Sequence, residues 1–371
     1  MEMMLLEECC EILDSMRIPI TASNRKEGIY PYYGANGIQD HVADYIFDDE
    51  LVLLAEDGGN FGSKTRPIAY RVSGKCWVNN HAHVLKPKEG LNVDFLCYSL
   101  MFYNTEGLVN GATRQKLTQT TMRKMLIPNL SIENQLYIVN QLNKLLKIIE
   151  LRKKEIQQLD NLTKARFVEM FGDPVANDKG WKTKPLLDMG KCKNGMNFHY
   201  DDSGVEISCL GVGDFKDLSV IDNTKKLSIV SLNEMPSEEY LLKDGDIVFV
   251  RSNGNKDLVG RSLAIYPGNL PTTFSGFCIR YRIHDDEITV PYLLRVLKME
   301  SMRKKMAGRG ANIQNLNQQI LGTLVIPVPP IELQNQFVDF VRAIDKSKVA
   351  VQKALDETQI LFDSLMQKYF G

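Results

Sequence analysis

The chain has 371 residues, of which 44% are apolar and 25% are charged. This composition is typical of globular proteins and excludes a disordered chain, a collagen-like fibre and a disulfide miniprotein. The length predicts two to three domains, and the formal net charge of −1 argues against a protein that coats DNA by bulk positive charge, although a local basic face remains compatible with it.

The first eight residues and the cysteines predict a cytoplasmic protein. Residues 1–8 carry acidic side chains and no basic region, so they do not form a signal peptide. The sequence has no run of about 18 apolar residues that would predict a membrane span. Seven cysteines without a C-x-x-C pair are typical of free thiols in a reducing cytosol.

Residues 28–110 read as short strands separated by turns. Runs rich in β-branched and aromatic residues alternate with turn signals such as Asn36-Gly37 and Asp57-Gly58-Gly59-Asn60. The predicted strands are Tyr45–Ala55, Ile68–Val72 and Trp77–Leu85, and a short helix is expected at about 92–104.

A long helix is predicted after Ile127-Pro128, at about residues 131–168. Its apolar residues fall three and four apart, which is the spacing of a heptad seam. These residues are Leu142, Leu145, Ile149, Ile156 and Leu159.

The second half of the chain repeats this order. Strands are predicted at Asp246–Arg251, Ser262–Tyr266 and Phe274–Ile283, a helical stretch at about 290–306, and a second long helix at about 331–369. The apolar seam of that helix is Val341, Ile344, Val351, Leu355, Phe362 and Leu365.

The two halves are copies of one module with an offset of 199 residues. Without gaps, residues 111–172 and 310–371 are identical at sixteen of 62 positions, whereas chance gives about one in twenty. Ile127-Pro128 matches Ile326-Pro327, and the Ile-Glu-x-Gln peptide at Ile132 matches that at Ile331. We interpret the chain as a variable part and a repeated part, each present twice.

Each predicted helix seam is interrupted once. Arg152 stands where the second copy has Val351, and Lys348 stands where the first copy has Ile149. Two stripes with interruptions at different places complement each other better than themselves, so we expect the two helices to pack together. The alternative is that each helix packs on its own domain.

Polar and basic side chains occur on the loops at corresponding places in both copies. Arginine reads guanine and asparagine or glutamine reads adenine in the major groove, while lysine and arginine also bind phosphates. The predicted DNA-contacting residues are Asn60, Lys64, Arg66, Asn80, His81, His83, Arg114 and Lys116 in the first copy, and Arg251, Asn253, Asn255, Lys256, Arg261, Arg309, Asn312 and Gln314 in the second. The alternative for each single residue is an ordinary solvated side chain.

Catalytic motifs are not found. The loop Gly59–Thr65 resembles a P-loop, but Ser63 between Gly62 and Lys64 breaks the required spacing. His81 and His83 on one strand face, with Cys76 nearby, could suggest zinc, but further paired ligands are missing from the sequence. Neither E-x-K nor H-E-x-x-H nor G-x-S-x-G occurs. We interpret the chain as non-catalytic, without a metal or cofactor of its own.

The order of these peptides resembles a known family. Gly-Ala-x-x-Gln-x-Leu, Ile-Pro and Ile-Glu-x-Gln lead into each long helix, and Phe171-Gly172-Asp173-Pro174 leads into the second variable part. Over essentially the whole chain, this pattern is similar to the specificity subunit of type I restriction–modification enzymes.

The resemblance implies a mixed α/β (α+β) fold with a pseudo-two-fold internal repeat. Two tandem target recognition domains of strands and short helices would be separated by two long helices, packed as an antiparallel coiled coil. The corresponding boundaries are 1–128 and 173–327 for the recognition domains, and 129–172 and 328–371 for the helices.

The resemblance also implies a function. Each recognition domain would read one half of a bipartite site in double-stranded DNA, and the helices would set the spacer and dock two modification subunits. S-adenosylmethionine and ATP would be bound by partner subunits only, including a restriction subunit that translocates and cleaves DNA. The alternatives from the residues themselves are a self-sufficient DNA-acting enzyme and a scaffold that does not bind nucleic acid.

Overall fold

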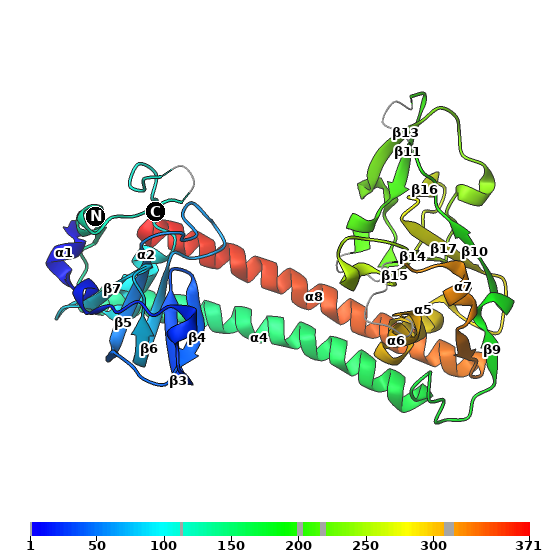
Figure 1. The fold of residues 1–371 in the computed structure, drawn as a ribbon, viewed down its shortest axis with the longest axis horizontal. Coiled ribbons are helices and arrows are strands. Elements are labelled where there is room, and N and C mark those ends of the chain that lie inside the picture. Colours follow the sequence, from blue (N-terminus) through cyan, green and yellow to red (C-terminus); the bar gives the residue numbers. More distant parts are fainter. Residues whose placement is uncertain (1, 112–113, 199–202, 216–219, 308–314) are drawn as a thin grey trace. The chain divides into compact units, whose positions relative to one another are not determined.

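The computed structural model describes residues 2–111, 114–198, 203–215, 220–307 and 315–371. The chain forms two compact units (Figure 1). Unit 1 contains residues 1–155 and 351–371, and unit 2 contains residues 156–350. Each unit therefore combines one variable domain with part of each long helix, whereas the boundaries predicted from the sequence separate domains from helices.

Unit 1 is built on a six-stranded sheet covered by α2 (Val93–Met101). Strand β5 is central, and its last five residues are completely buried, which explains its apolar sequence. The strand order is β2 (Cys10–Ile12), β7 (Ala82–Pro87), β5 (Phe47–Ala55), β6 (Ala69–Val78), β3 (Glu27–Gly34) and β4 (Gly37–Val42).

Unit 2 is built on a five-stranded and a three-stranded sheet, with the helices α5 (Val290–Lys298) and α6 (Glu300–Ala307). The larger sheet has the order β10 (Gly190–Asn194), β17 (Cys278–Ile283), β14 (Asp246–Val250), β15 (Ser262–Ile265) and β12 (Val220–Ile221). The smaller sheet has the order β13 (Ser228–Leu232), β11 (Val205–Leu210) and β16 (Thr272–Phe274). Strand β14 is buried along its whole length and corresponds to β5.

The repeated peptides form equivalent junctions in the two units. Each Ile-Pro lies in a three-residue strand that pairs antiparallel with an entering strand. These pairs are β1 (Met3–Leu5) with β8 (Leu126–Pro128), and β9 (Thr183–Pro185) with β18 (Val325–Pro327). A short helix precedes each Ile-Pro strand, namely α3 (Gln119–Arg123) and α7 (Gln318–Gly322), while α1 (Leu6–Cys9) follows β1.

Both predicted long helices are confirmed, as α4 (Ile132–Phe171) and α8 (Ile331–Phe370), each 40 residues long. In unit 1, Arg152 of α4 donates hydrogen bonds to the Ala354 carbonyl and the Thr358 hydroxyl of α8. In unit 2, the Lys348 ammonium of α8 lies 2.8 Å from the Asp160 carboxylate of α4. The interrupting residues of the two seams are thus each satisfied by the partner helix, as the expected pairing requires.

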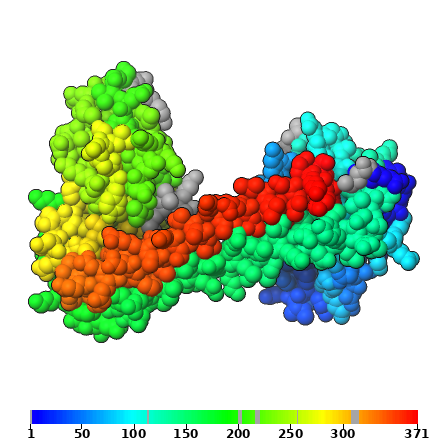
Figure 2. Space-filling view, turned by 180° about the vertical axis from the view of Figure 1, so that it is seen from behind, coloured from blue at the N-terminus to red at the C-terminus, as the bar shows by residue number. Residues whose placement is uncertain are grey.

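The helix segments run antiparallel within each unit. In unit 1, Tyr98 contacts Asn143 of α4 and Phe362 of α8, whereas Arg152, further along α4, meets earlier residues of α8. In unit 2, Phe167 packs against Phe337, at the end of α4 and the start of α8. Figure 2 shows α8 lying beside α4. The expected antiparallel coiled coil is confirmed.

A buried glutamine attaches the start of each long helix to its variable domain. In unit 1, the Gln135 amide donates to the carbonyls of Gly90 (3.0 Å) and Leu130 (2.8 Å) and accepts from the Asn92 backbone N–H (2.8 Å). Asn92 is the N-cap of α2. The side chain of Gln135 is satisfied although the residue is only 1% exposed.

Gln334, the repeat partner of Gln135, makes the same contacts in unit 2. Its amide donates to the carbonyls of Glu287 (2.8 Å) and Pro329 (2.9 Å) and accepts from the backbone N–H of Thr289 (2.9 Å), the N-cap of α5. We call Gln135 and Gln334 the anchoring glutamines. They explain why Ile-Glu-x-Gln recurs in both copies.

The phenylalanine of each repeated Phe-Gly packs on the same two short helices. Phe171, which ends α4, lies 4.8 Å from Tyr292 of α5, measured between ring centroids. Phe370, which ends α8, lies 5.3 Å from Phe95 of α2. Each variable domain is therefore attached to the start of one long helix and the end of the other.

The strand predicted at Trp77–Leu85 is wrong, because it is two strands joined by a turn. Strand β6 ends at Val78, and β7 begins at Ala82. The Asn79 side-chain oxygen accepts a hydrogen bond from the His81 backbone N–H (2.8 Å), which closes a tight Asx-type turn. The predicted strand Phe274–Ile283 is divided in the same way between β16 and β17.

Among the helices of the described residues, none is both long and apolar enough to cross a membrane.

Replacing an anchoring glutamine should destabilise its unit. In Gln135→Leu, one backbone N–H and two carbonyls lose their buried partner, so we expect unit 1 to lose roughly 2–5 kcal/mol of unfolding free energy. Urea titration followed by Trp77 fluorescence, in a Trp181→Phe background, measures this loss. The matched control Asn140→Leu, at an exposed position of the same helix within unit 1, should change stability by less than about 0.5 kcal/mol. Equal effects of the two variants would contradict the anchoring role.

Candidate nucleic-acid interface

The polar loops begin at the same place in the two units, where the buried central strand ends. In unit 1, the backbone N–H of Leu117 donates to the Glu56 carbonyl (2.7 Å), just after β5. In unit 2, the backbone N–H of Leu316 donates to the Arg251 carbonyl (2.7 Å), just after β14. Because Leu117 and Leu316 are repeat partners, Glu56 and Arg251 occupy corresponding positions.

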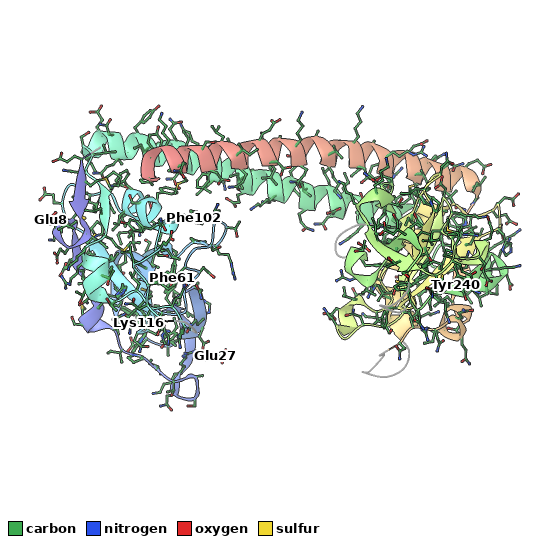
Figure 3. The ribbon with its side chains drawn as sticks, turned by 90° about the horizontal axis from the view of Figure 1, so that it is seen from above. Glu8, Glu27, Phe61, Phe102, Lys116 and Tyr240 are labelled. Atoms are coloured by element: carbon green, nitrogen blue, oxygen red, sulfur yellow. The ribbon has the colours of Figure 1, made fainter. Side chains whose placement is uncertain are left out.

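In unit 1, the segment that ends in Arg114, Gln115 and Lys116 lies beside the loop that follows β5. Asn110 and Lys116 exchange two backbone hydrogen bonds of 3.0 and 2.8 Å. The backbone N–H of Gly58 donates to the Gln115 carbonyl (3.1 Å), and the Asn36 side chain donates to the Gly58 carbonyl (3.0 Å). Figure 3 labels Lys116 on this segment. Residues far apart in the sequence thus form one surface.

The exposed layer of this surface is centred on Asp57. One of its carboxylate oxygens lies 2.6 Å from the His81 Nδ1 and 2.9 Å from the Arg114 Nη2. The side chain of Asp57 is 20% exposed and that of Arg114 is 58% exposed. The structure therefore brings together His81 and Arg114, two of the predicted DNA-contacting residues, on a carboxylate that sequence reasoning missed.

A second carboxylate lies beneath the first. Glu56 binds the guanidinium of Arg17 (2.6 Å) and the ammonium of Lys116 (3.0 Å). Burial alone would raise the pKa of the Glu56 carboxyl, but the hydrogen bonds from Arg17 and Lys116 hold it below its usual value. Lys116, another predicted residue, is therefore exposed but ion-paired.

His83 is a correction to the predicted set. It is fully buried, with Nδ1 2.6 Å from the Asp14 carboxylate and Nε2 2.9 Å from the Leu117 carbonyl. Both ring nitrogens are occupied within the fold, so His83 supports the polar surface from below and cannot contact DNA. Since the strand begins only at Ala82, His81 and His83 do not share a strand face as predicted.

The other predicted residues of unit 1 lie on the rim. Lys64, Arg66 and Asn80 are exposed, and Asn60 is half-buried with its amide 3.5 Å from the Pro67 carbonyl. Lys64 also borders a cleft of about 730 Å³ beside the end of α8. Figure 3 labels Phe61 and Phe102, which line this cleft.

In unit 2, the loop after β14 carries Arg251, Asn253 and Asn255. The guanidinium of Arg251 lies 3.4 Å from the Gly276 carbonyl. The side-chain oxygens of Asn253 and Asn255 accept from the backbone N–H groups of Asn255 (2.8 Å) and Asp257 (3.0 Å). These oxygens shape the loop, and each amide also carries two N–H donors.

Unit 2 is more positive than unit 1 at this place. Arg261 donates to the Asp257 carbonyl (3.2 Å), and Arg303 of α6 donates to the Val259 carbonyl (3.2 Å). Burial lowers the pKa of Lys298 to about 8, and three arginines contribute to this shift. They are Arg295, Arg261 and Arg303. Closely spaced cations of this kind suit a polyanion.

Some predicted positions are not tested by these contacts. Arg309, Asn312 and Gln314 lie outside the described residues, and Lys256 begins the short 3₁₀ turn Lys256–Leu258.

The loop Gly59–Thr65 lacks the setting of a nucleotide-binding loop. It connects β5 to β6, both strands of one sheet, so it does not lead into a helix whose N-terminus could bind phosphates.

A metal site at the histidines is not supported either. Within the described residues, one group of potential ligands comes close together, namely Asp14, Glu56 and His83. Arg17 already pairs with both carboxylates and Lys116 with Glu56. This donor set is thus neutralised by side-chain cations.

The missed residues carried no local signal. Asp14 is 69 residues from His83, and Arg17 is 39 residues from Glu56. The sequence indicates Asp57 only as part of a turn signal. The Gly58 conformation, with φ of 62°, agrees with that turn, but the pairing of Asp57 with Arg114 depends on the fold.

Comparisons of the amino-acid sequence show which family the chain resembles. The family model for the type I restriction modification DNA specificity domain matches residues 1–161 and 178–358. A putative type I restriction enzyme specificity subunit of Haemophilus influenzae is 28% identical over 377 residues, covering 98% of this chain and 92% of the relative. The StySPI specificity subunit of Salmonella potsdam is 24% identical and covers 86% of this chain and 74% of the relative.

Solved structures agree on the fold. The type I restriction–modification S subunit from M. genitalium has a TM-score of 0.57 at 16% identity, covering 100% of this chain and 96% of that one. A chain from a study of complex assembly in a type I R-M system has a TM-score of 0.59 at 16% identity, with coverage of 100% and 97%. The chain therefore belongs to the type I restriction–modification DNA specificity family. Its role is that of the DNA-specificity subunit, a non-catalytic component of such a system.

The carboxylates beneath the unit 1 surface predict acid sensitivity. Burial would raise the pKa of Asp14, but His83 and Arg17 hold it below the ordinary value, and the pKa of Glu56 is lowered as well. Groups with depressed pKa values stabilise the fold above their unfolded pKa values, near 4, and lose this contribution as the pH falls through the folded ones. The melting temperature of the full chain should therefore decrease when the pH is lowered below about 4.

Glu56→Gln should lower the unfolding free energy of unit 1 at neutral pH by about 1–3 kcal/mol and flatten the acid decline, because Arg17 and Lys116 lose their carboxylate. Thermal unfolding from neutral to acidic pH measures both effects. The matched control Glu89→Gln, at an exposed position, should reproduce the wild-type profile. An unchanged profile in Glu56→Gln would contradict this account of the buried layer.

Proposed function

We propose that each unit reads one half of a bipartite, asymmetric DNA site. The observation that supports this most strongly is the equivalence of the Leu117–Glu56 and Leu316–Arg251 hydrogen bonds. Through them, the duplicated framework presents a polar loop at the same strand end in both units. The loops themselves differ in sequence, so the two half-sites need not be related by symmetry.

The proposed DNA contacts are all members of the predicted set except His83, which is buried. In unit 1 they are Asn60, Lys64, Arg66, Asn80, His81, Arg114 and Lys116, and in unit 2 they are Arg251, Asn253, Asn255, Lys256, Arg261, Arg309, Asn312 and Gln314. To these we add Arg303, because it holds the loop next to Arg261.

The long helices are proposed to set the spacer and to bind two modification subunits. Their exposed apolar side chains support docking, because large apolar groups in water favour a protein partner. Tyr137 is 60% exposed on α4, and Val349 and Ile360 are 69% and 66% exposed on α8. S-adenosylmethionine and ATP would be bound by the modification and restriction subunits of this cytoplasmic complex.

The two alternative functions fit less well. A self-sufficient enzyme needs a nucleotide or metal site, and the loop Gly59–Thr65 and the Asp14–Glu56–His83 group have the wrong settings for these. A scaffold protein that does not bind nucleic acid would not explain why polar loops occur at the same place in both units.

The half-sites should be read independently, because the loops belong to separate units. Arg251→Ala should relax the preference at one half-site by roughly 5- to 150-fold at the affected base pair and leave the other intact. The measurement is selection from a library of randomised duplexes by the full chain with its cognate modification subunit. Arg342→Ala, an exposed arginine of unit 2 on α8 that is 76% exposed, is the matched control. Equal loss at both half-sites would contradict separate reading, and recovery of no sequence by the wild type would contradict the proposed function.

The spacer should follow the length of the helix pair. The register of α4 against α8 requires that both helices be changed together. Seven residues inserted after Glu155 and after Ala350 keep the heptad phase and add about 10 Å, or about three base pairs at 3.4 Å each. The same selection should return unchanged half-sites with a longer spacer. An unchanged spacer would show that the helices do not set it.

A further inference from the structure

We infer that Asp57 makes Arg114 a reader of a guanine base in the first half-site, and not a contact to the phosphate backbone. This inference rests on the proposed function and goes beyond it by naming the base and the residue that orients its reader. It is carried by three features of unit 1: the hydrogen bonds of Asp57, the backbone at Gly58 and the balance of charge around Arg114.

Asp57 fixes the direction of the guanidinium. Its Oδ1 accepts from Arg114 Nη2 at 2.9 Å, and the same oxygen lies 2.6 Å from His81 Nδ1. Asp57 is itself held in place, because it forms a β-bridge to Lys116 on the returning segment. Arg114 Nη2 also lies 3.3 Å from His81 Nδ1. Because Nδ1 donates its own hydrogen to the Asp57 carboxylate, it does not accept from Arg114. The bond to Asp57 therefore uses one of the five donor hydrogens of the guanidinium, and an edge with two donors remains for another molecule.

The backbone of Gly58 lies against the Arg114 guanidinium and leaves room for it because glycine has no side chain. Its φ of 62° lies in the left-handed region, and a Cβ atom added there would lie 3.2 Å from Arg114 Nε. A side chain at position 58 would therefore be strained and would also crowd the arginine. The backbone and the carboxylate together order a side chain that would otherwise move freely in solvent, since 58% of it is exposed.

The charge balance argues against a phosphate. Arg114 is paired with Asp57, Lys116 with Glu56, and Arg17 with both Glu56 and Asp14. The formal charges of these three cations and three carboxylates cancel. A phosphodiester carries a full negative charge and would approach two nearby carboxylates, whereas a base edge is neutral and meets no such repulsion.

Guanine matches the two donors that remain free on the Arg114 guanidinium. In the major groove it presents two acceptors, N7 and O6, which match two parallel N–H donors of an arginine. Adenine presents one acceptor and one donor there, and cytosine presents a donor amine. An arginine held by a carboxylate on one side and open on the other therefore discriminates in favour of guanine.

The corresponding place in unit 2 has the opposite character. Arg251 and Ser252 stand where unit 1 has Glu56 and Asp57, as the bridge from Ser252 to Asn315 confirms. Without these carboxylates, the cations of that loop are suited to phosphates as well as bases. We therefore expect the first half-site to depend less on salt than the second.

The test uses the full chain with its cognate modification subunit. Duplexes are first selected from a randomised library, and the affinities for the selected duplex and a scrambled one are then measured over a range of salt concentrations. Arg114→Ala should abolish the preference for guanine at one position of the first half-site, a loss of roughly 5- to 150-fold in discrimination, with an unchanged salt slope.

Asp57→Asn provides a second, independent variant. It keeps Arg114 in the chain but removes the charge that orients its guanidinium and repels phosphates. Binding to the scrambled duplex should tighten, and the slope of log affinity against log salt should become steeper by about one. Arg123→Ala is the matched control, because Arg123 pairs with Glu7 at 3.6 Å elsewhere in unit 1, and it should match the wild type.

The outcomes separate the inference from the proposed function. If the wild type enriches no sequence, the proposed function fails, and the inference fails with it. If the wild type enriches a bipartite sequence but Arg114→Ala retains the same preference for guanine in the first half-site, the inference alone is overturned. It is also overturned if Arg114→Ala loses affinity equally for both duplexes and its salt slope becomes shallower by about one, because Arg114 is then a phosphate contact.

Discussion

The rest of the structure depends on a buried polar contact that occurs twice. Gln135 and Gln334 are 1% and 0% exposed, and each joins the first turn of a long helix to the N-cap of a short helix in the adjacent variable domain. A buried amide that loses its partners costs more than an apolar contact of similar size, so these bonds fix one geometry. Phe171 and Phe370 complete the attachment at the other end of each helix.

This arrangement separates the residues that hold the fold from those that face the target. The repeated peptides supply the anchoring glutamines, the Ile-Pro strands and the terminal phenylalanines, and these are equivalent in both units. The loops after β5 and β14 leave the same framework but carry Glu56 and Asp57 in one unit and Arg251 and Ser252 in the other. A duplicated framework can thereby present two surfaces with different charge, which suits an asymmetric target.

Much of the fold could be predicted from the sequence, but the candidate site only in part. The repeat, both long helices and their pairing follow from a sequence match at a fixed offset and from a heptad spacing, which can both be read from the sequence without knowing the fold. The burial of His83 could not be predicted, because its partner Asp14 is 69 residues away. The alternation that suggested one strand through Asn79 was broken by a side-chain-to-backbone hydrogen bond. The role of Asp57 likewise depends on a segment that returns to it from Arg114.

The measurement that tests the central claim most directly is a genome-wide map of DNA methylation in cells that express this chain with its cognate modification subunit. The account predicts methylation at one bipartite motif, with two unrelated half-sites and a spacer of fixed length. Exchanging residues 173–327 for the corresponding part of another family member should replace one half-site and keep the other. A single continuous motif, or a motif that changes as a whole after the exchange, would contradict the account.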